Sequence, residues 1–306
     1  MKKIIQVLGP TGVGKSEVAI LLAKKIGGEI ISADSMQVYK DFDIGTAKLS
    51  KQDMKNIPHH LIDILSDCSQ YNAARFSEMS FEIAIQIKKR GHIPIVCGGT
   101  ALYLKIMISG VFPELKKKRI PRTHLNNLGE SRGGEFLWKQ LNEVDPEYAK
   151  KISVNDRLRL VRALDIYYNQ GLPPSEIFKK TVSLFKQFQF IRVGLNMERD
   201  KLYEKINHRV DHMMGSGFIE EVKKLRKKYP LDCPPFSSLG YKEISQLLDG
   251  VINSTEALRL IRQHTRNFAK RQLSWFRREK DIIWFHPDNV EQIILFVEEK
   301  FQNKSD

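Results

Sequence analysis

Eight residues near the N-terminus match the pattern G-x-x-x-x-G-K-[ST], which is typical of loops that bind a diphosphate or polyphosphate. They are Gly9, Pro10, Thr11, Gly12, Val13, Gly14, Lys15 and Ser16. Segment 4–8 predicts a short buried strand before the loop, and segment 16–25 predicts an amphipathic helix after it. In this arrangement backbone N–H groups and the helix N-terminus bind phosphate oxygens. Lys15 then adds a positive charge, and the Ser16 hydroxyl is the expected protein ligand of a Mg²⁺ cofactor.

Alternating strands and helices follow the loop. Strands are predicted at 29–33, 60–64 and 93–97, with helices at 72–90 and 101–109. This order predicts an α/β fold with a doubly wound parallel sheet, of the P-loop NTPase-like, kinase-like class. Because ligands of such sheets bind beyond the carboxyl ends of the strands, we expect three segments at one edge. They are the phosphate loop, residues 34–37 and residues 98–100.

The sequence changes character near residue 111, where strands no longer alternate with helices. Lysine and arginine fill positions 116–119, and helices are predicted over 135–144 and 154–170. We therefore expect a catalytic core made of residues 1–110 and 196–306, with a helical insertion at 111–195.

Positive charge is concentrated in two segments. The 306-residue chain has a net charge of +14 and a pI of about 9.5. Residues 111–195 contribute +7, and residues 255–280 contribute +6. A basic surface can simply favour solubility, but an excess confined to two segments favours a nucleic-acid partner.

Cysteine usage and apolar runs bear on the compartment. The three cysteines are widely spaced and form no C-x-x-C pair, which predicts buried or incidental thiols and neither a disulfide framework nor a zinc ribbon. No apolar run approaches the ~20 residues of a membrane span. There is also no signal-peptide pattern, so a cytoplasmic protein without a membrane partner is expected.

Three polar residues at the predicted sheet edge are candidates for catalysis or ligand binding. Asp34 can act as a general base, as an outer ligand of Mg²⁺, or simply as a turn cap. Gln37 has the donors and acceptors needed to read a base edge. Thr100 follows two glycines that allow close ligand approach, although Thr is also an ordinary N-cap.

Arginines recur at helical spacing in both basic segments. Arg159 and Arg162 project together from the helix at 154–170 and suit phosphate contacts. The helix from 255 has an apolar face with Leu258, Ile261, Phe268 and Trp275, and a basic stripe with Arg259, Arg262, Arg266, Lys270 and Arg277. Because no acidic residue interrupts that stripe, we expect an anion to relieve its repulsion. Arg199 and Arg209 are further candidates to hold a pyrophosphate, and Lys242 is a basic residue beside a glycine turn.

An ordered set of motifs spans nearly the whole chain. Besides the phosphate loop it comprises DSMQVY at 34–39, GGTALY at 98–103, RAL at 162–164, RVD at 209–211, LGYKE at 239–243 and RQLSWF at 271–276. In this set the chain resembles the bacterial tRNA dimethylallyltransferases, the IPP transferase family. The resemblance implies transfer of a dimethylallyl group from its diphosphate to the exocyclic amine of the adenine 3′ to the tRNA anticodon. It also implies a kinase-like core and a tRNA-gripping insertion.

The resemblance assigns roles by position. Asp34 matches the general base, and Thr100 matches a residue that contacts the reacting adenine and phosphate. The implied tRNA contacts are Asp34, Ser35, Met36, Gln37, Thr100, Arg122, Leu158, Arg159, Arg162, Lys242, Arg259, Arg262 and Arg266. The partners implied are dimethylallyl diphosphate and the anticodon stem-loop of tRNA.

Two other enzyme classes share the core. One is a small-molecule or nucleotide kinase, whose insertion would be a lid over ATP; the other is a nucleic-acid-stimulated ATPase. The two basic segments exceed what a lid requires, and no hydrophobic strand ending in Asp-Glu suggests a hydrolytic site. One RNA-binding surface makes a monomer the simplest expectation.

Overall fold

The apolar runs of the sequence form one parallel sheet in the computed structural model, which describes residues 2–111 and 121–302. The strand order is β3-β2-β4-β1-β5-β6, and every pairing is parallel. The strands are β1 (Lys2–Leu8), β2 (Gly28–Ser32), β3 (His59–His60), β4 (Ile93–Gly98), β5 (Phe188–Leu195) and β6 (Ile283–Phe285). Residues of β2 and β4 are buried on both faces, as expected for strands covered by helices on each side.

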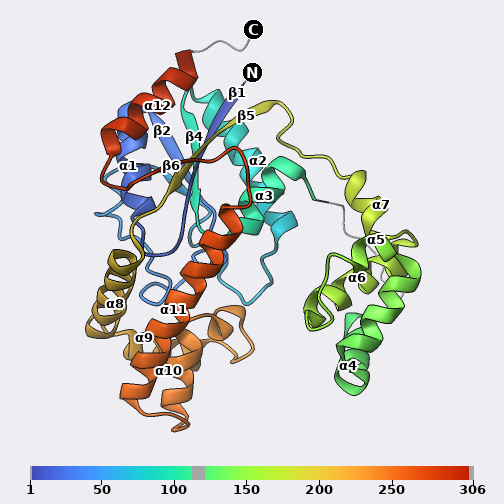
Figure 1. Ribbon diagram of the computed structural model, residues 1–306. Helices are drawn as coiled ribbons and strands as arrows, with labels where there is room; N and C mark the ends of the chain where they lie inside the picture. The colour runs from blue at the N-terminus through green and yellow to red at the C-terminus, as the bar shows by residue number, and fades with distance from the viewer. Residues whose placement is uncertain (1, 112–120, 303–306) are drawn as a thin grey trace. The chain divides into compact units, whose positions relative to one another are not determined.

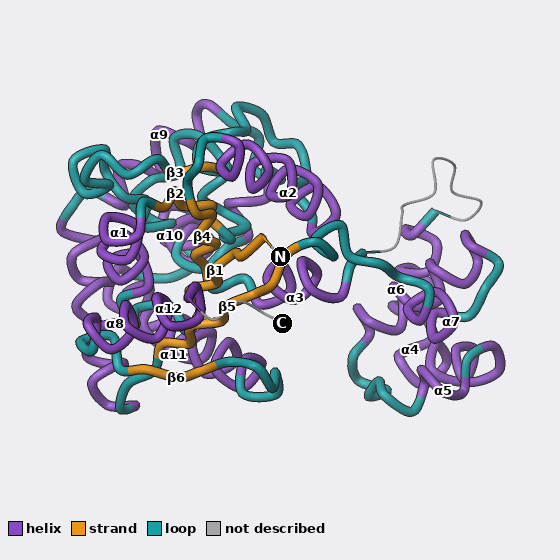
Figure 2. The backbone as a smooth tube through the Cα atoms, turned by 90° about the horizontal axis from the view of Figure 1, so that it is seen from above, coloured by secondary structure: helices purple, strands orange, loops and turns teal. Residues whose placement is uncertain are grey.

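Helices cover both faces of this sheet, which confirms the predicted doubly wound α/β class. Helices α1, α8 and α12 lie on one face, and α2 and α3 lie on the other (Figure 2). Helices α9, α10 and most of α11 lie beyond the carboxyl ends of the strands (Figure 1). The bounds are α1 (Lys15–Ile26), α2 (Ala73–Lys89), α3 (Ala101–Ser109), α8 (Arg199–Gly215), α9 (Phe218–Lys228), the 3₁₀ helix η1 (Pro234–Ser237), α10 (Tyr241–Leu248), α11 (Ser254–Phe276) and α12 (Val290–Gln302).

A second unit, residues 109–183, is helical and has its own apolar core. Its helices are α4 (Arg122–Val144), α5 (Pro146–Ala149), α6 (Arg157–Gln170) and α7 (Pro174–Lys179). Leu137 and Leu141 of α4 pack with Leu160 and Leu164 of α6 in this core. Helix α4 is interrupted at Gly133, whose φ of 80° is not helical. The basic run at 116–119 lies outside the described residues.

The unit boundaries differ from those expected at the C-terminal side of the insertion. The core unit comprises residues 1–108 and 184–306, so it resumes well before residue 196. Strand β5 pairs with the central strand β1 over seven residues, and it therefore belongs to the core sheet. The strand expected at 60–64 is also shorter, because Leu61 and Asp63 adopt positive φ angles after β3.

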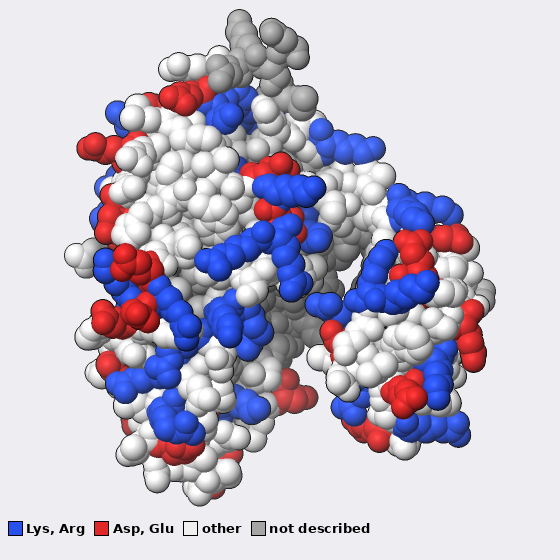
Figure 3. Space-filling model, in the orientation of Figure 1, with Lys and Arg blue, Asp and Glu red and all other residues white. Residues whose placement is uncertain are grey.

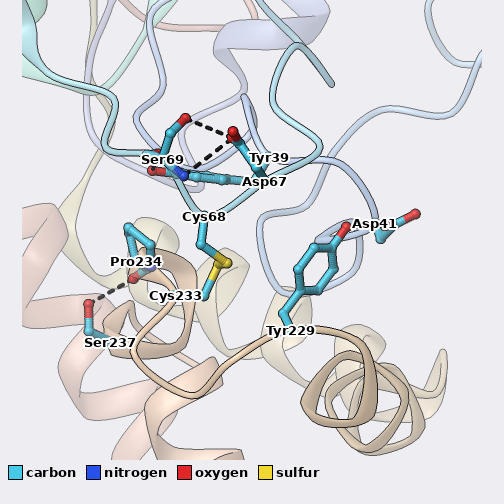
Figure 4. The surroundings of a disulfide bond; sticks show 9 residues. All are labelled: Tyr39, Asp41, Asp67, Cys68, Ser69, Tyr229, Cys233, Pro234 and Ser237. Atoms are coloured by element: carbon cyan, nitrogen blue, oxygen red, sulfur yellow. Dashed lines mark hydrogen bonds between the residues drawn. A yellow bond between two sulfur atoms is a disulfide. The ribbon is translucent and has the colours of Figure 1, made fainter.

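The cysteine prediction was wrong. Cys68, in the segment before α2, forms a disulfide with Cys233, which precedes η1 (Figure 4). The two residues are 165 positions apart in sequence, and their Cα atoms are 4.9 Å apart. Spacing along the chain carries no signal for such a pair, because only the tertiary fold brings the two segments together. The third cysteine, Cys97, is a buried free thiol, as expected.

Among the helices of the described residues, none combines the length and the apolar composition that a membrane span requires.

Candidate active site

A cavity of about 480 Å³ lies at the carboxyl edge of the sheet, within the core unit. The phosphate loop, the segment after β2 and the turn after β4 all contribute to its wall, as the parallel-sheet argument predicts. Helices α8 and α11 and residues 237–240 form other parts of the wall. Predicted residues that line it are Thr11, Lys15, Ser16, Asp34, Ser35, Met36, Gln37, Thr100 and Arg209.

The phosphate loop has the conformation that its glycines allow. Gly14 has a φ of 102° and immediately precedes α1, a backbone geometry that residues with a Cβ rarely adopt. The Lys15 ammonium donates a hydrogen bond to the Pro10 carbonyl at 2.7 Å. The pKa of Lys15 is lowered to about 8, mainly by burial and also by nearby Arg209, although Cys97 and Asp34 act in the opposite direction. A phosphate at this position would favour the charged ammonium.

Ser16 and Asp34 are the residues available for a magnesium ion. Both side chains line the cavity, and the Ser16 hydroxyl makes no hydrogen bond to another described residue. No group of three or more His, Cys, Asp or Glu side chains among the described residues is arranged to hold a metal. Mg²⁺ usually takes one or two protein oxygens together with phosphate oxygens and waters. The donor set therefore fits a Mg²⁺ that arrives with a diphosphate.

The two arginines predicted to hold a pyrophosphate have different environments. Arg209 lines the cavity beside Lys15 and Asp34, and burial lowers its pKa while Asp34 opposes that shift. Its guanidinium has no hydrogen bond or ion pair with another described residue. Arg199 is exposed at the start of α8, stacks over Tyr203 and does not line the cavity. The expectation for Arg199 is therefore wrong for this cavity, because ten helical residues separate the two side chains by ~15 Å along the axis.

Asp34 makes the contacts of a turn cap, one of the three roles considered for it. Its Oδ1 accepts hydrogen bonds from the backbone N–H groups of Met36 at 2.8 Å and Gln37 at 3.2 Å. This cap fixes the carboxylate at the cavity wall. Its Oδ2 has no hydrogen bond to a described residue, which leaves that oxygen free to accept a proton.

Gln37 makes structural contacts that the sequence did not suggest. Its amide nitrogen donates to the carbonyls of Thr46 and Ala47, and its amide oxygen accepts from the Ser32 hydroxyl. Its side chain is therefore occupied in the structure, and it links the Asp34 turn to the segment at 45–47 that also lines the cavity.

Glu221, on α9, holds the same segment and was missed at the sequence level. Its carboxylate accepts backbone hydrogen bonds from Asp43, Ile44 and Gly45 and a hydrogen bond from the Tyr241 hydroxyl. An acidic residue in the first turn of a helix is so common that it gave no signal. Its three backbone partners lie 176 to 178 positions earlier in the chain, so only the fold reveals them.

Thr100 lies where a close backbone approach brings β4 and the Asp34 turn together. A Cβ at Gly98 would lie 2.2 Å from the Ala33 carbonyl oxygen, so only glycine fits there. The Thr100 N–H donates to that same carbonyl, and its hydroxyl makes no hydrogen bond to a described residue. The hydroxyl is thus available to a ligand in the cavity.

Gln272, on α11, connects two parts of the cavity wall. Its side-chain oxygen accepts from the Thr11 N–H at 2.8 Å, and its side-chain nitrogen donates to the Gly99 carbonyl at 2.9 Å. The sequence contained Gln272 within a motif but gave no reason to assign it this role.

In the insertion, the predicted tRNA-contacting arginines are tied to acidic residues. Arg122 and Arg162 both bind the buried carboxylate of Asp165, each at 2.8 Å. Arg159 pairs with Asp156, the cap of α6, at 3.2 Å. Leu158, at the same end of α6, is 82% exposed.

The basic stripe on α11 is not the uninterrupted row of free cations that was expected. Arg259 pairs with Glu256, Arg262 pairs with Asp211 of α8, and Arg266 donates to Asn207 of α8. The prediction failed because these arginines have partners: an acidic residue one turn earlier in α11, and an acidic and an amide residue of α8. Exposed Lys270 and Arg277 of the same region have no ion pair with a described residue, and Figure 3 shows Lys and Arg side chains gathered over α11. Lys242 is exposed on α10 and does not line the cavity.

A family model and the related proteins found by sequence comparison all indicate the same family. The family model described as IPP transferase matches residues 37–279. A tRNA dimethylallyltransferase of Geobacillus thermodenitrificans is 40% identical, over 98% of this chain and 96% of the relative. One from Carboxydothermus hydrogenoformans is 44% identical, over 93% of this chain and 92% of the relative.

Solved structures are similar over nearly the whole chain. A tRNA isopentenylpyrophosphate transferase from Bacillus halodurans has a TM-score of 0.74 at 36% identity, with 99% of this chain and 97% of that chain covered. A eukaryotic dimethylallyltransferase acting on tRNA has a TM-score of 0.80 at 31% identity, with 98% of this chain and 77% of that chain covered.

Proposed function

Because this chain belongs to the IPP transferase family, we propose that it transfers a dimethylallyl group from dimethylallyl diphosphate to tRNA. The acceptor is the exocyclic amine of the adenine immediately 3′ to the anticodon, and diphosphate is released. The observation that carries the proposal is one cavity lined by both a phosphate loop and a fixed carboxylate, Asp34. The names of the related proteins support the same reaction.

The diphosphate binds through the loop backbone, Lys15 and Arg209. Since Arg209 has no acidic side chain hydrogen-bonded to it among the described residues, its donors are available to the phosphate oxygens. The Ser16 hydroxyl would hold a Mg²⁺ that binds with the diphosphate, and that ion would supply positive charge where negative charge develops on the leaving group.

The transfer exchanges one bond for another. The allylic carbon–oxygen bond breaks and leaves its electron pair on the diphosphate, while the adenine nitrogen forms a bond to the allylic carbon. The nitrogen loses a proton, which Asp34 accepts at Oδ2. Thr100 offers its hydroxyl to the acceptor. An adenine can reach a cavity of this kind only when it leaves the base stack, so the target nucleotide flips out.

Basic side chains outside the cavity bind the phosphates of the anticodon stem-loop. Arg122, Arg159 and Arg162 of the insertion serve this role, together with basic side chains of α11. With a single RNA-binding surface, the protein acts as a monomer in the cytoplasm, where tRNA is matured.

The proposal is tested by incubating the protein with Mg²⁺, labelled dimethylallyl diphosphate and unmodified tRNA, beside a parallel reaction with ATP. Label entering the tRNA supports the proposal. ATP consumption without label transfer overturns it and favours a kinase or an RNA-stimulated ATPase. A tRNA with guanine at the acceptor position is the control, because it lacks an exocyclic amine at that ring position.

A further inference from the structure

The aromatic side chain of Phe268 lies outside the hydrophobic core. The spacing of Leu258, Ile261, Phe268 and Trp275 predicted one core-facing stripe. Leu258, Ile261 and Trp275 do pack in the core, but Phe268 is absent from every hydrophobic cluster and is 36% exposed. It lines the cavity instead. An exposed aromatic ring in a cavity wall offers a flat apolar surface to a ligand.

Arg271 completes that surface. Its guanidinium lies 5.8 Å from the centre of the Phe268 ring, and it lines the same cavity. No ion pair joins Arg271 to an acidic residue in the described part of the chain. A ring and a guanidinium are the two planar side-chain groups on which nucleic-acid bases stack.

The position of the ring is fixed relative to the reactive groups. Phe268 and Gln272 are four residues apart on α11, so they project from the same face of the helix. Gln272 is hydrogen-bonded to Thr11 of the phosphate loop and to Gly99, the residue before Thr100. The helix turn with Phe268 is thereby held against both the diphosphate site and the Thr100 turn.

We propose that Phe268, with Arg271 beside it, forms the stacking wall for the adenine that enters the cavity. This inference rests on the proposed function, because it assigns a binding surface to the acceptor base of that reaction. The apolar ring stabilises the base outside the RNA stack, and it acts on the acceptor and not on the diphosphate.

Three substitutions test the ring face. Phe268→Tyr retains an aromatic face, Phe268→Leu retains an apolar side chain without one, and Phe268→Ala removes both. Stacking of a base on an aromatic side chain contributes on the order of 1–3 kcal/mol. The kcat/KM for an anticodon stem-loop should therefore fall roughly 5- to 150-fold in the Leu and Ala variants. In the Tyr variant it should fall less than about threefold. The KM for dimethylallyl diphosphate and the unfolding temperature should not change. Asn267→Ala, an exposed neighbour outside the cavity wall, is the matched control.

A fluorescent base gives a second readout. A stem-loop with 2-aminopurine at the acceptor position should brighten on binding to the wild-type protein, because the base leaves the RNA stack, and should brighten less on binding to Phe268→Leu, because less of the base is held outside the stack. Wild-type activity in Phe268→Leu, or a rise in the KM for the diphosphate alone, would overturn the stacking inference and leave the proposed function intact. Absence of transfer by the wild-type protein would overturn both.

Discussion

Arg209 of the core and Arg122 of the insertion are both predicted anion ligands, but their surroundings differ. Arg209 lies in a cavity with Lys15, and no described residue accepts a hydrogen bond from it. Arg122 shares the buried Asp165 carboxylate with Arg162. Partly buried cations that no described acidic side chain ion-pairs attract a bound anion strongly, because among the described carboxylates only nearby Asp34 offsets their charge. Paired arginines keep their full charge, but the neighbouring carboxylate offsets part of its field and holds the side chains in place. The core is therefore suited to binding one small anion, and the insertion to orienting a large one.

The largest effect is expected when the proposed general base of the core, Asp34, is replaced. Asp34→Asn keeps an oxygen to accept from the Met36 and Gln37 N–H groups but cannot take a proton. We expect kcat to fall about 10²- to 10⁴-fold, the usual contribution of a general base. Binding of tRNA, measured by filter retention, should stay within about twofold of wild type. Turnover within tenfold of wild type would show that another group accepts the proton.

The pH dependence of donor binding tests the role of the Lys15 charge in the cavity. The pKa of Lys15 is about 8 without a ligand, and a bound diphosphate raises it. Below pH 8 the lysine is already charged, so the KM for dimethylallyl diphosphate should be flat. Above pH 8 binding requires uptake of a proton, and the KM should rise toward about tenfold per pH unit.

Lys15→Arg is the control for this prediction. Arginine stays charged throughout the range, so the rise in KM should disappear even if the absolute activity is lower. The same rise in the arginine variant would assign the titration to another group.

A smaller effect is expected in the insertion. In Arg122→Ala, Asp165 keeps its contacts with Arg162 and Asn169, so the unit should remain folded. Loss of one charge-assisted phosphate contact, about 1.5 kcal/mol, should weaken binding of the stem-loop roughly tenfold. The KM for the diphosphate should not change. Lys139→Ala, an exposed cation on α4 paired with Glu135, is the control. Equal losses in both variants would mean that Arg122 has no specific contact.

The smallest expected effect distinguishes Lys270 and Arg277, which have no ion pair with a described residue, from the arginines of α11 that contact α8. Replacing Lys270 and Arg277 with alanine should reduce the slope of log affinity against log salt by roughly 1.4–1.8, at 0.7–0.9 per phosphate contact. Arg262→Ala removes the partner of Asp211 and should lower stability more than it changes the slope. The opposite result would show that the α8-facing arginines are the ones that contact RNA.

Local features of the chain were sufficient to predict most elements of the core sheet. The phosphate loop, the Asp34 turn and the Thr100 turn were placed together from the rule for parallel sheets, and all three line one cavity. The predictions failed where partners come from distant segments. Arg199 shares a helix with Arg209 but not its cavity, and the α11 arginines find partners on α8 that no spacing within α11 reveals.

Local residue patterns specify the chemical groups that the chain has available: a phosphate loop, a carboxylate at the end of a strand, and two basic segments. These depend on local spacing, which fixes backbone geometry within a few residues. Which of these groups are already engaged by a partner depends on the folded arrangement of the chain. This arrangement paired Cys68 with Cys233, occupied Gln37 with Thr46 and Ala47, and left Phe268 on the cavity wall. The reason is physical, since hydrogen bonds and burial depend on contacts between segments that lie far apart in the chain.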